Sequence, residues 1–145
     1  MLRAAVIYAP DEAPMRDLAQ RVAAALDRGR FVVVVKPAAQ AAIPDLAASD
    51  LVLLGSAAQG AAAVHSDFAE LLRALSGVNL AGRVAGLFSS GGEAALLALK
   101  KALKDTDIHL AAENLLPAGH ARSGRRIAEW IALLTEQLET ITHGR

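Results

Sequence analysis

The sequence predicts an α/β fold in which five parallel strands form a doubly wound sheet in the order 2-1-3-4-5, with helices on both faces. Short apolar runs alternate with stretches of helical periodicity along 145 residues, as is typical of right-handed crossovers between parallel strands. Most of these runs are continuously apolar, which indicates strands buried on both faces. Hydrophobic residues make up 54% of the chain. We expect residues 1–145 to form a single domain.

The predicted strands are residues 4–8, 31–35, 51–54, 84–88 and 108–112, and the fifth has the weakest pattern. Between the second and third strands, residues 43–47 leave room for only a turn or two of helix. Apolar residues at three- and four-residue spacing predict four longer helices. Their stripes are Met15, Leu18, Val22 and Leu26; Phe68, Leu71, Leu72 and Leu75; Leu96, Leu99 and Leu103; and Ile127, Ile131, Leu134, Leu138 and Ile141.

Composition excludes several classes of function. Fifteen basic and fifteen acidic residues give a formal net charge of zero, whereas nucleic-acid-binding domains usually carry a basic excess. No apolar run approaches the roughly 18 residues that a membrane span needs. Cysteine is absent, which excludes disulfides, thiolate metal sites and a cysteine nucleophile. We expect no nucleic-acid partner, no membrane partner and a cytoplasmic location.

Three segments carry a family resemblance. Residues 48–56 place an acidic residue before an apolar run and a Gly-Ser pair after it. Residues 79–91 lead into the fourth strand and a Ser-Ser-Gly loop, and residues 128–131 hold the tryptophan of the final helix. In these segments the chain resembles the flavodoxin family, and the resemblance spans nearly the whole chain. It implies a flavodoxin-like fold and, as the family's function, FMN binding and electron transfer.

The loop after the first strand departs from that family. Flavodoxins surround the FMN phosphate there with hydroxyl side chains and backbone N–H groups, whereas residues 9–14 here are Ala-Pro-Asp-Glu-Ala-Pro. Pro10 and Pro14 lack an N–H donor, and Asp11 and Glu12 place negative charge where a dianion would bind. We therefore predict a degenerate FMN-phosphate loop and expect no cofactor, with FMN as the alternative. The two acids themselves fit solvated carboxylates near a helix N-terminus better than metal ligands or an acid–base pair.

Ligands of such sheets bind at the carboxyl ends of the strands, at the point where the strand order reverses. The loops that follow the third and fourth strands lie there, although the third-strand loop lacks the aromatic ring that flavodoxins often place against the flavin. If a ligand binds at this edge, the candidate binding residues are Ser56, Ala57, Gln59, Ser89, Ser90, Gly91 and Gly92. The other interpretation of the second group is a tight turn and helix cap, because Ser90 and Glu93 have capping-box spacing, as do Asp67 and Glu70.

Two further features leave alternatives open. His120, Arg122, Arg125 and Arg126 precede or begin the last helix, where cations oppose the helix dipole. They could serve an anionic ligand or an acidic partner, or form a solvated basic face in which Arg125 pairs with a glutamate one turn on. Trp130 extends the buried face of that helix or forms an exposed patch for a protein partner or a homo-oligomer.

No catalytic or metal-binding set is predicted. The four histidines, His65, His109, His120 and His143, lack metal-ligand spacing, and no Gly-x-Ser-x-Gly elbow is present. The leading hypothesis is a binding or interaction module without tight FMN binding. The first alternative is an FMN-binding electron-transfer protein, and a weaker one is a small-molecule enzyme that uses the strand-edge loops.

Overall fold

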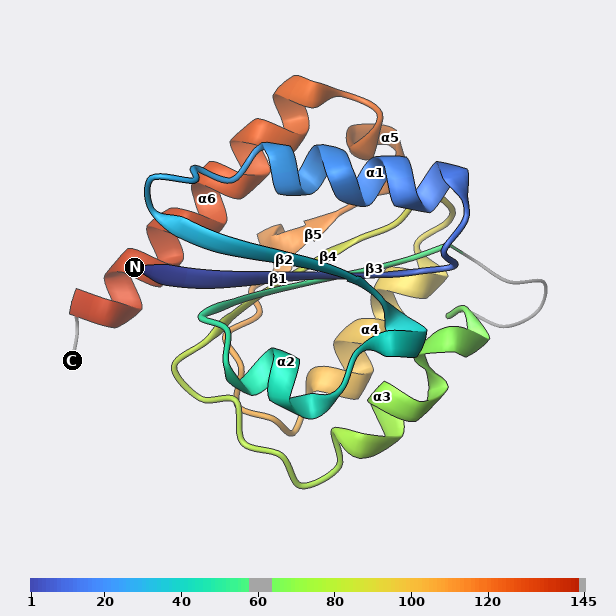
Figure 1. The fold of residues 1–145 in the computed structure, drawn as a ribbon, viewed down its shortest axis with the longest axis horizontal. Coiled ribbons are helices and arrows are strands. Elements are labelled where there is room, and N and C mark those ends of the chain that lie inside the picture. The colour runs from blue at the N-terminus through green and yellow to red at the C-terminus, as the bar shows by residue number, and fades with distance from the viewer. Residues whose placement is uncertain (58–63, 144–145) are drawn as a thin grey trace.

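A three-layer α/β/α arrangement is seen in the computed structural model, which describes residues 1–57 and 64–143 (Figure 1). The central sheet has five parallel strands in the order β2-β1-β3-β4-β5, so the predicted fold class and strand order are confirmed. The strands are β1 (Leu2–Ala9), β2 (Phe31–Pro37), β3 (Leu51–Ser56), β4 (Val84–Phe88) and β5 (Leu115–Leu116).

Helices cover both faces of the sheet. In Figure 1, α1 and α6 lie on one face, and α2, α3 and α4 lie on the other. The helices are α1 (Ala13–Ala24), α2 (Ile43–Ala47), α3 (Ala69–Ala74), α4 (Ala94–Leu103), α5 (Ala118–Ala121) and α6 (Gly124–His143), with short 3₁₀ turns η1 (Ala38–Gln40), η2 (Ser66–Phe68) and η3 (Ala112–Asn114).

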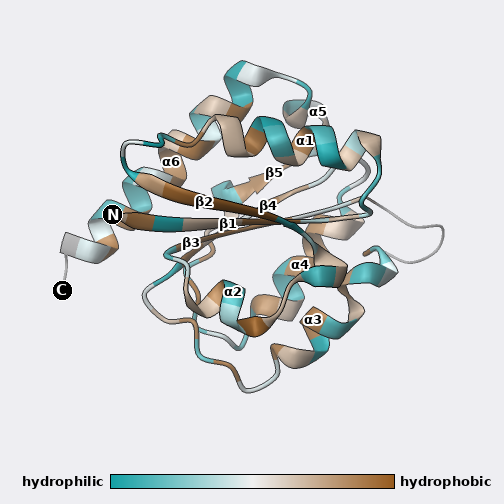
Figure 2. Cartoon of the chain, in the orientation of Figure 1, coloured by the Kyte–Doolittle hydropathy of each residue, from teal (hydrophilic) through white to brown (hydrophobic). Residues whose placement is uncertain are grey.

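The core is divided by the sheet into two apolar clusters. One joins α1 and α6 to one face and contains Met15 and Val22 of α1, Leu134 of α6 and Val6 of β1. The other joins α3 and α4 to the opposite face. Because alternate strand residues point to opposite faces, β1 contributes Ala4, Val6 and Tyr8 to the first cluster and Ala5, Ile7 and Ala9 to the second. Figure 2 shows the brown, hydrophobic strands between helices that are brown on one side and teal on the other.

The prediction for the fifth strand is wrong in position. Residues 108–112 make only one isolated bridge, in which His109 pairs with Val84 beside β4. The chain then turns through η3, and β5 forms afterwards, with Leu115 and Leu116 opposite Leu87 and Phe88. In the interruption, the Nδ2 of Asn114 donates to the carbonyl of Ala85 at 2.8 Å. A buried side-chain amide therefore takes the place of a backbone hydrogen bond at this point. The sequence did not reveal β5 because a strand of two residues is too short to show a periodic pattern.

The two capping-box predictions are also wrong. The residue before α3 is Phe68 and the residue before α4 is Glu93, and neither makes a side-chain capping bond. The imidazole of His65 caps the preceding turn η2 instead, because its Nδ1 accepts from the N–H of Asp67 at 3.1 Å. Asp67 thus takes part in this cap through its backbone N–H, rather than through its side chain as predicted.

Trp130 belongs to the core. Its side chain is 5% exposed, its ring meets Phe88 edge-on with centroids 6.2 Å apart, and its Nε1 donates to the carbonyl of Asn114 at 2.9 Å. The alternative in which Trp130 forms an exposed patch is therefore wrong. Over the described residues, no helix combines the length and the low charge required to cross a bilayer.

Candidate functional site

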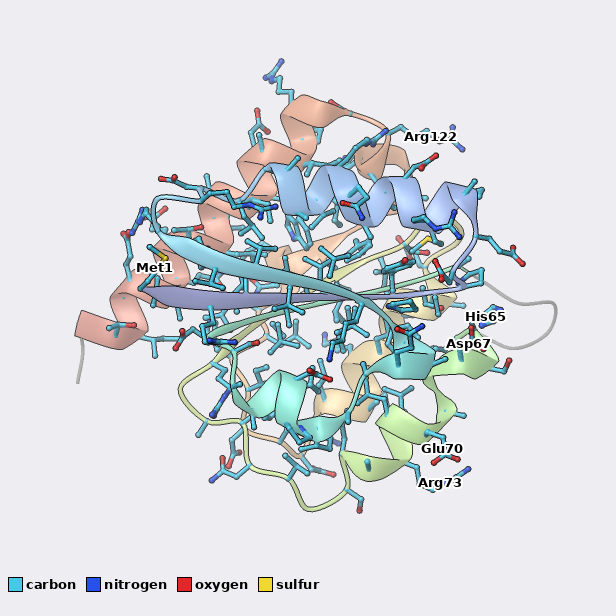
Figure 3. All side chains as sticks on the ribbon, in the orientation of Figure 1. Met1, His65, Asp67, Glu70, Arg73 and Arg122 are labelled. Atoms are coloured by element: carbon cyan, nitrogen blue, oxygen red, sulfur yellow. The ribbon has the colours of Figure 1, made fainter. Side chains whose placement is uncertain are left out.

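The carboxyl ends of β1, β3 and β4 meet at one edge of the sheet. Ala9 lies opposite Ser56, and Gly55 lies opposite Phe88, in the register of the parallel ladder. The chain segments that leave these ends are therefore neighbours, as the strand order predicts. Figure 3 labels Arg122, His65 and Asp67 at this end of the molecule and Met1 at the other.

The turn between β1 and α1 is organised by its own side chains. The hydroxyl of Tyr8 donates to Oδ1 of Asp11 at 2.8 Å. Arg16 donates from Nε to the same oxygen at 3.0 Å and from its second guanidinium nitrogen to the carbonyl of Asp11 at 2.8 Å. Asp11 is thus bonded on both its carboxylate and its carbonyl. Asp11 is exposed, as the interpretation of a solvated acid predicts, and it also links the end of β1 to the first turn of α1.

These contacts shift the titration of all three groups. The hydrogen bond from Tyr8, and after it the bond from Arg16, lowers the pKa of Asp11 below its ordinary value. Burial raises the pKa of Tyr8, and the bond to Asp11 raises it further. The hydrogen bond and charge of Asp11 raise the pKa of Arg16. At neutral pH the turn therefore holds a carboxylate and a guanidinium whose charges balance. The neighbouring Glu12 occupies the N-cap position of α1 without a side-chain capping bond.

Ser56 and Ala57, the described candidates at the end of β3, are hydrogen-bonded within the chain rather than offering free polar groups. Ser56 is fully buried. Its hydroxyl donates to the carbonyl of Ala57 at 2.8 Å and accepts from the N–H of His65 at 2.9 Å. The N–H of Ala57 donates to the carbonyl of Ala9 at 3.0 Å. Gln59 lies outside the described residues. Ser56 thus closes the base of this loop and ties its two ends together.

The candidate residues after β4 divide into a buried serine and an exposed one. Ser89 is fully buried, and its hydroxyl accepts from the N–H of Gly91 at 3.0 Å, which forms a tight turn. Ser90 and Gly92 are exposed, and a methyl group added at Gly92 would meet no atom within 4 Å. Ser90 is therefore the only one of the two serines whose hydroxyl faces solvent.

A small pocket of about 180 Å³ joins this loop to α1 and α5. Ser90 and Arg122 line it, together with Asp17 and Arg21 of α1. Arg21 is also hydrogen-bonded to the carbonyl of Ala121, so it fastens α1 to α5. The pocket is smaller than the roughly 300–1,000 Å³ typical of ligand sites.

The predicted basic cluster does not act as one unit. Of its four members, only Arg122 lines the pocket beside Ser90. Arg125 pairs with Glu129 through an Nε–Oε1 contact of 2.9 Å, which confirms that pairing, and Arg126 approaches the same carboxylate at 4.0 Å. The solvated basic face therefore describes Arg125 and Arg126. Arg122 is the member that reaches the carboxyl edge.

Every aromatic side chain of the protein is buried. The chain has one Trp, one Tyr and three Phe, and each is at most 5% exposed. Tyr8, the next-to-last residue of β1, and Phe88, the last residue of β4, belong to the apolar cluster beneath the edge. No Phe, Tyr or Trp ring is thus presented at the surface for a flat ligand to stack on. Among the described residues there is also no group of three metal-ligating side chains close enough to hold an ion.

Three site residues escaped the sequence analysis: Tyr8, Arg16 and Arg21. The five-residue separation of Asp11 and Arg16 matches no regular helical pairing, and Arg21 contacts a residue 100 positions away. Tyr8 gave one usable signal, since a buried tyrosine hydroxyl at the end of a strand requires a polar partner. Asp11 is the nearest polar side chain that follows it in the sequence.

Comparison with known proteins identifies the fold. No protein-family profile matches the chain, and no curated protein matches its sequence. Among solved structures, a short-chain flavodoxin associated with a non-canonical PDU bacterial microcompartment aligns over 95% of this chain and 99% of its own, at 18% identity and a TM-score of 0.83. The protein has the flavodoxin fold.

Two further flavodoxins agree with this assignment. Oxidised flavodoxin 2 from Bacillus cereus aligns over 93% of this chain and 99% of its own, at 18% identity and a TM-score of 0.80. A Fusobacterium nucleatum flavodoxin bound to flavin mononucleotide aligns over 94% and 99%, at 12% identity and a TM-score of 0.72. At these identities the likeness establishes the flavodoxin fold, and the function has to be argued from the site.

Proposed function

We propose that this flavodoxin-fold protein is a binding module that does not hold FMN tightly and uses its carboxyl edge for a small polar ligand or a protein surface. The observation that carries the proposal is the β1–α1 turn, in which Tyr8, Asp11 and Arg16 already bond to one another. The burial of all five aromatic residues supports it.

A phosphate dianion in this turn would need donors that the turn does not supply. Pro10 and Pro14 have no N–H, and residues 9–14 contain no hydroxyl side chain. If Arg16 turned towards the phosphate the two nitrogens that now bond Asp11, it would release Asp11. The released carboxylate would then face a dianion, and each close pair of like unit charges near a protein surface costs up to about 4 kcal/mol. Phosphate binding would therefore lose the Arg16–Asp11 contact and would also add repulsion between Asp11 and the phosphate.

The second candidate function is FMN-dependent electron transfer. The N-terminus of α1 favours it, since the first N–H groups of a helix lack internal partners and attract anions. The Fusobacterium flavodoxin with the same fold is described as bound to flavin mononucleotide. In this case Arg16 would release Asp11 and bind the phosphate, and the flavin would supply the one-electron chemistry.

Flavin titration tests the choice between the two functions. We expect the purified protein to be colourless near 450 nm and to show no saturable FMN binding at micromolar concentration. Riboflavin, which lacks the phosphate, should bind no more weakly than FMN. Copurified flavin, or a micromolar Kd for FMN, would overturn the proposal in favour of electron transfer.

A charge variant tests the physical reason. Asp11→Asn removes the carboxylate from the turn, and we expect FMN to bind about tenfold more tightly than to the parent, equivalent to about 1.4 kcal/mol, with riboflavin unchanged. Asp105→Asn, at an exposed residue that follows α4, is the matched control and should change neither ligand. Equal effects of the two variants on FMN would show that general charge, rather than the turn, governs binding.

A further inference from the structure

A second surface of the protein lies away from the carboxyl edge, where α4 packs beside the segment that precedes β5. Here a groove of about 440 Å³ has an apolar floor formed by Leu97, Leu103, Ile108 and Leu110. Leu97 is 57% exposed, which makes it one of the three large exposed hydrophobic residues of the described chain. The floor combines buried core residues with a leucine that the fold leaves open to solvent.

Three lysines stand beside this floor. Lys100, Lys101 and Lys104 line the same groove and follow Leu97 at spacings of three, four and seven residues, so the four side chains share one face of α4. No ion pair involves these lysines in the part of the chain that the structure describes. No acidic residue lines the groove. We call the apolar floor with these three lysines the α4 groove.

The lysine pattern is not explained by the stability of the helix alone. Cations in the last turn of a helix interact favourably with its dipole, but like charges three and four residues apart repel one another. The acid that shares this face, Glu93, lies at the other end of α4 and makes no ion pair with the lysines in the described part of the chain. Exposed arginines elsewhere differ in this respect, since Arg73 pairs with Glu70 and Arg125 pairs with Glu129.

The groove also continues towards the other end of α4. A second pocket of about 230 Å³ shares Leu97 and extends past Leu115 to Pro117, with Glu93 as its only charged lining residue. Together the two pockets follow the whole helix, which is about 15 Å long at 1.5 Å per residue. They lie along β5, the edge strand of the sheet. A concave, elongated surface of this kind fits a chain segment better than a flat lipid surface.

From this arrangement we propose that the α4 groove binds an acidic segment of a protein partner, with an apolar side chain of the segment over Leu97 and its carboxylates against the lysines. The three lysines have no ion-pair partner among the described residues and are complementary in charge to the carboxylates of such a segment. The inference concerns a surface separate from the carboxyl edge and does not depend on whether FMN binds there.

A peptide titration of the full ¹⁵N-labelled chain tests the proposal. The probe is a 12-residue peptide in which pairs of glutamates alternate with single leucines. Two control peptides are compared with it: one has serine in place of each leucine, and the other has lysine in place of each glutamate. We expect saturable NMR shift changes centred on Leu97, Lys101 and Leu110 with the first peptide only. The Kd should weaken at least threefold between low salt and 0.3 M salt, because screening shortens the reach of the lysine charges.

Charge-reversal variants provide the control. Lys100→Glu combined with Lys101→Glu should weaken the first peptide at least tenfold, and Leu97→Ser should weaken it at least threefold. Arg125→Glu on α6, which covers the opposite face of the sheet (Figure 1), should leave the Kd within a factor of two. Far-UV circular dichroism checks folding, and Lys101→Glu alone replaces the double variant if that variant unfolds.

Several outcomes would overturn the proposal. One is the absence of saturable shifts with the glutamate–leucine peptide, and another is equal binding of the lysine–leucine peptide. Shifts that map to another surface, or concentration-dependent self-association through Leu97, would also contradict it. The groove would be assigned to a membrane instead if the protein bound vesicles of phosphatidylglycerol and phosphatidylcholine, if the lysine variants lost that binding, and if the glutamate–leucine peptide did not bind.

Discussion

The contact between Gly55 and Phe88 gives the sharpest quantitative prediction. A Cβ atom built on Gly55 would lie 2.1, 2.3 and 2.4 Å from three ring carbons of Phe88, whereas ordinary van der Waals contact begins at 3.4 Å. The ring has no free space into which to withdraw, because Phe88 is fully buried and meets Trp130 edge-on. Gly55→Ala should therefore overpack the end of β3.

Overpacking of this kind costs about 1–3 kcal/mol. With a urea m-value of about 2 kcal/mol/M for a chain of this size, Gly55→Ala should lower the unfolding midpoint by about 0.5–1.5 M. The fluorescence of Trp130, the sole tryptophan, reports the transition. Gly92→Ala is the matched control, since its Cβ would have no neighbour within 4 Å, and its free energy of unfolding should stay within about 0.5 kcal/mol of the parent value.

A double-mutant cycle identifies the cause. In a Phe88→Leu background the ring is absent, so the cost of Gly55→Ala should fall by at least about 1 kcal/mol. The same cost in both backgrounds would refute the contact with the ring. A Gly55→Ala midpoint equal to that of Gly92→Ala would refute the whole argument from packing.

Two further variants test polar contacts. The hydrogen bond from Tyr8, followed by the bond from Arg16, lowers the pKa of Asp11 in the folded protein. The ionised Asp11 therefore stabilises the fold fully above its ordinary pKa of about 3.9. This contribution is lost as the pH falls through the lowered pKa of the folded state. Tyr8→Phe should raise the Asp11 midpoint in a carboxyl NMR titration, and an unchanged midpoint would exclude that bond. Asn114→Ala should cost about 1–3 kcal/mol in urea unfolding because the buried carbonyl of Ala85 loses its donor; an unchanged midpoint would show that another group replaces the amide.

The layers of this fold follow from local patterns in the sequence. Val52, Leu53 and Leu54 are consecutive and all fully buried, which requires a strand covered on both faces. Leu96, Leu99 and Leu103 are buried along one side of α4. Burial at fixed spacing is a property of each segment alone, so α1, α2, α3, α4, α6 and four of the strands were predictable, whereas the four-residue α5 was not. The composition of the turn after β1 is likewise the basis for predicting a degenerate FMN-phosphate loop, which the flavin titration tests.

Only the tertiary structure determined which polar groups meet. Asp11 faces Tyr8 and Arg16 because the direction in which the chain leaves β1 places all three together, and Ser90 shares a pocket with Arg122 because α5 packs beside α1. The two-residue β5 depends on an amide that bridges to Ala85. Such contacts join residues at irregular separations, and no repeating pattern in the sequence encodes them. The sequence by itself therefore determined the framework and its unusual first loop, whereas packing decided what that loop binds to within its own chain.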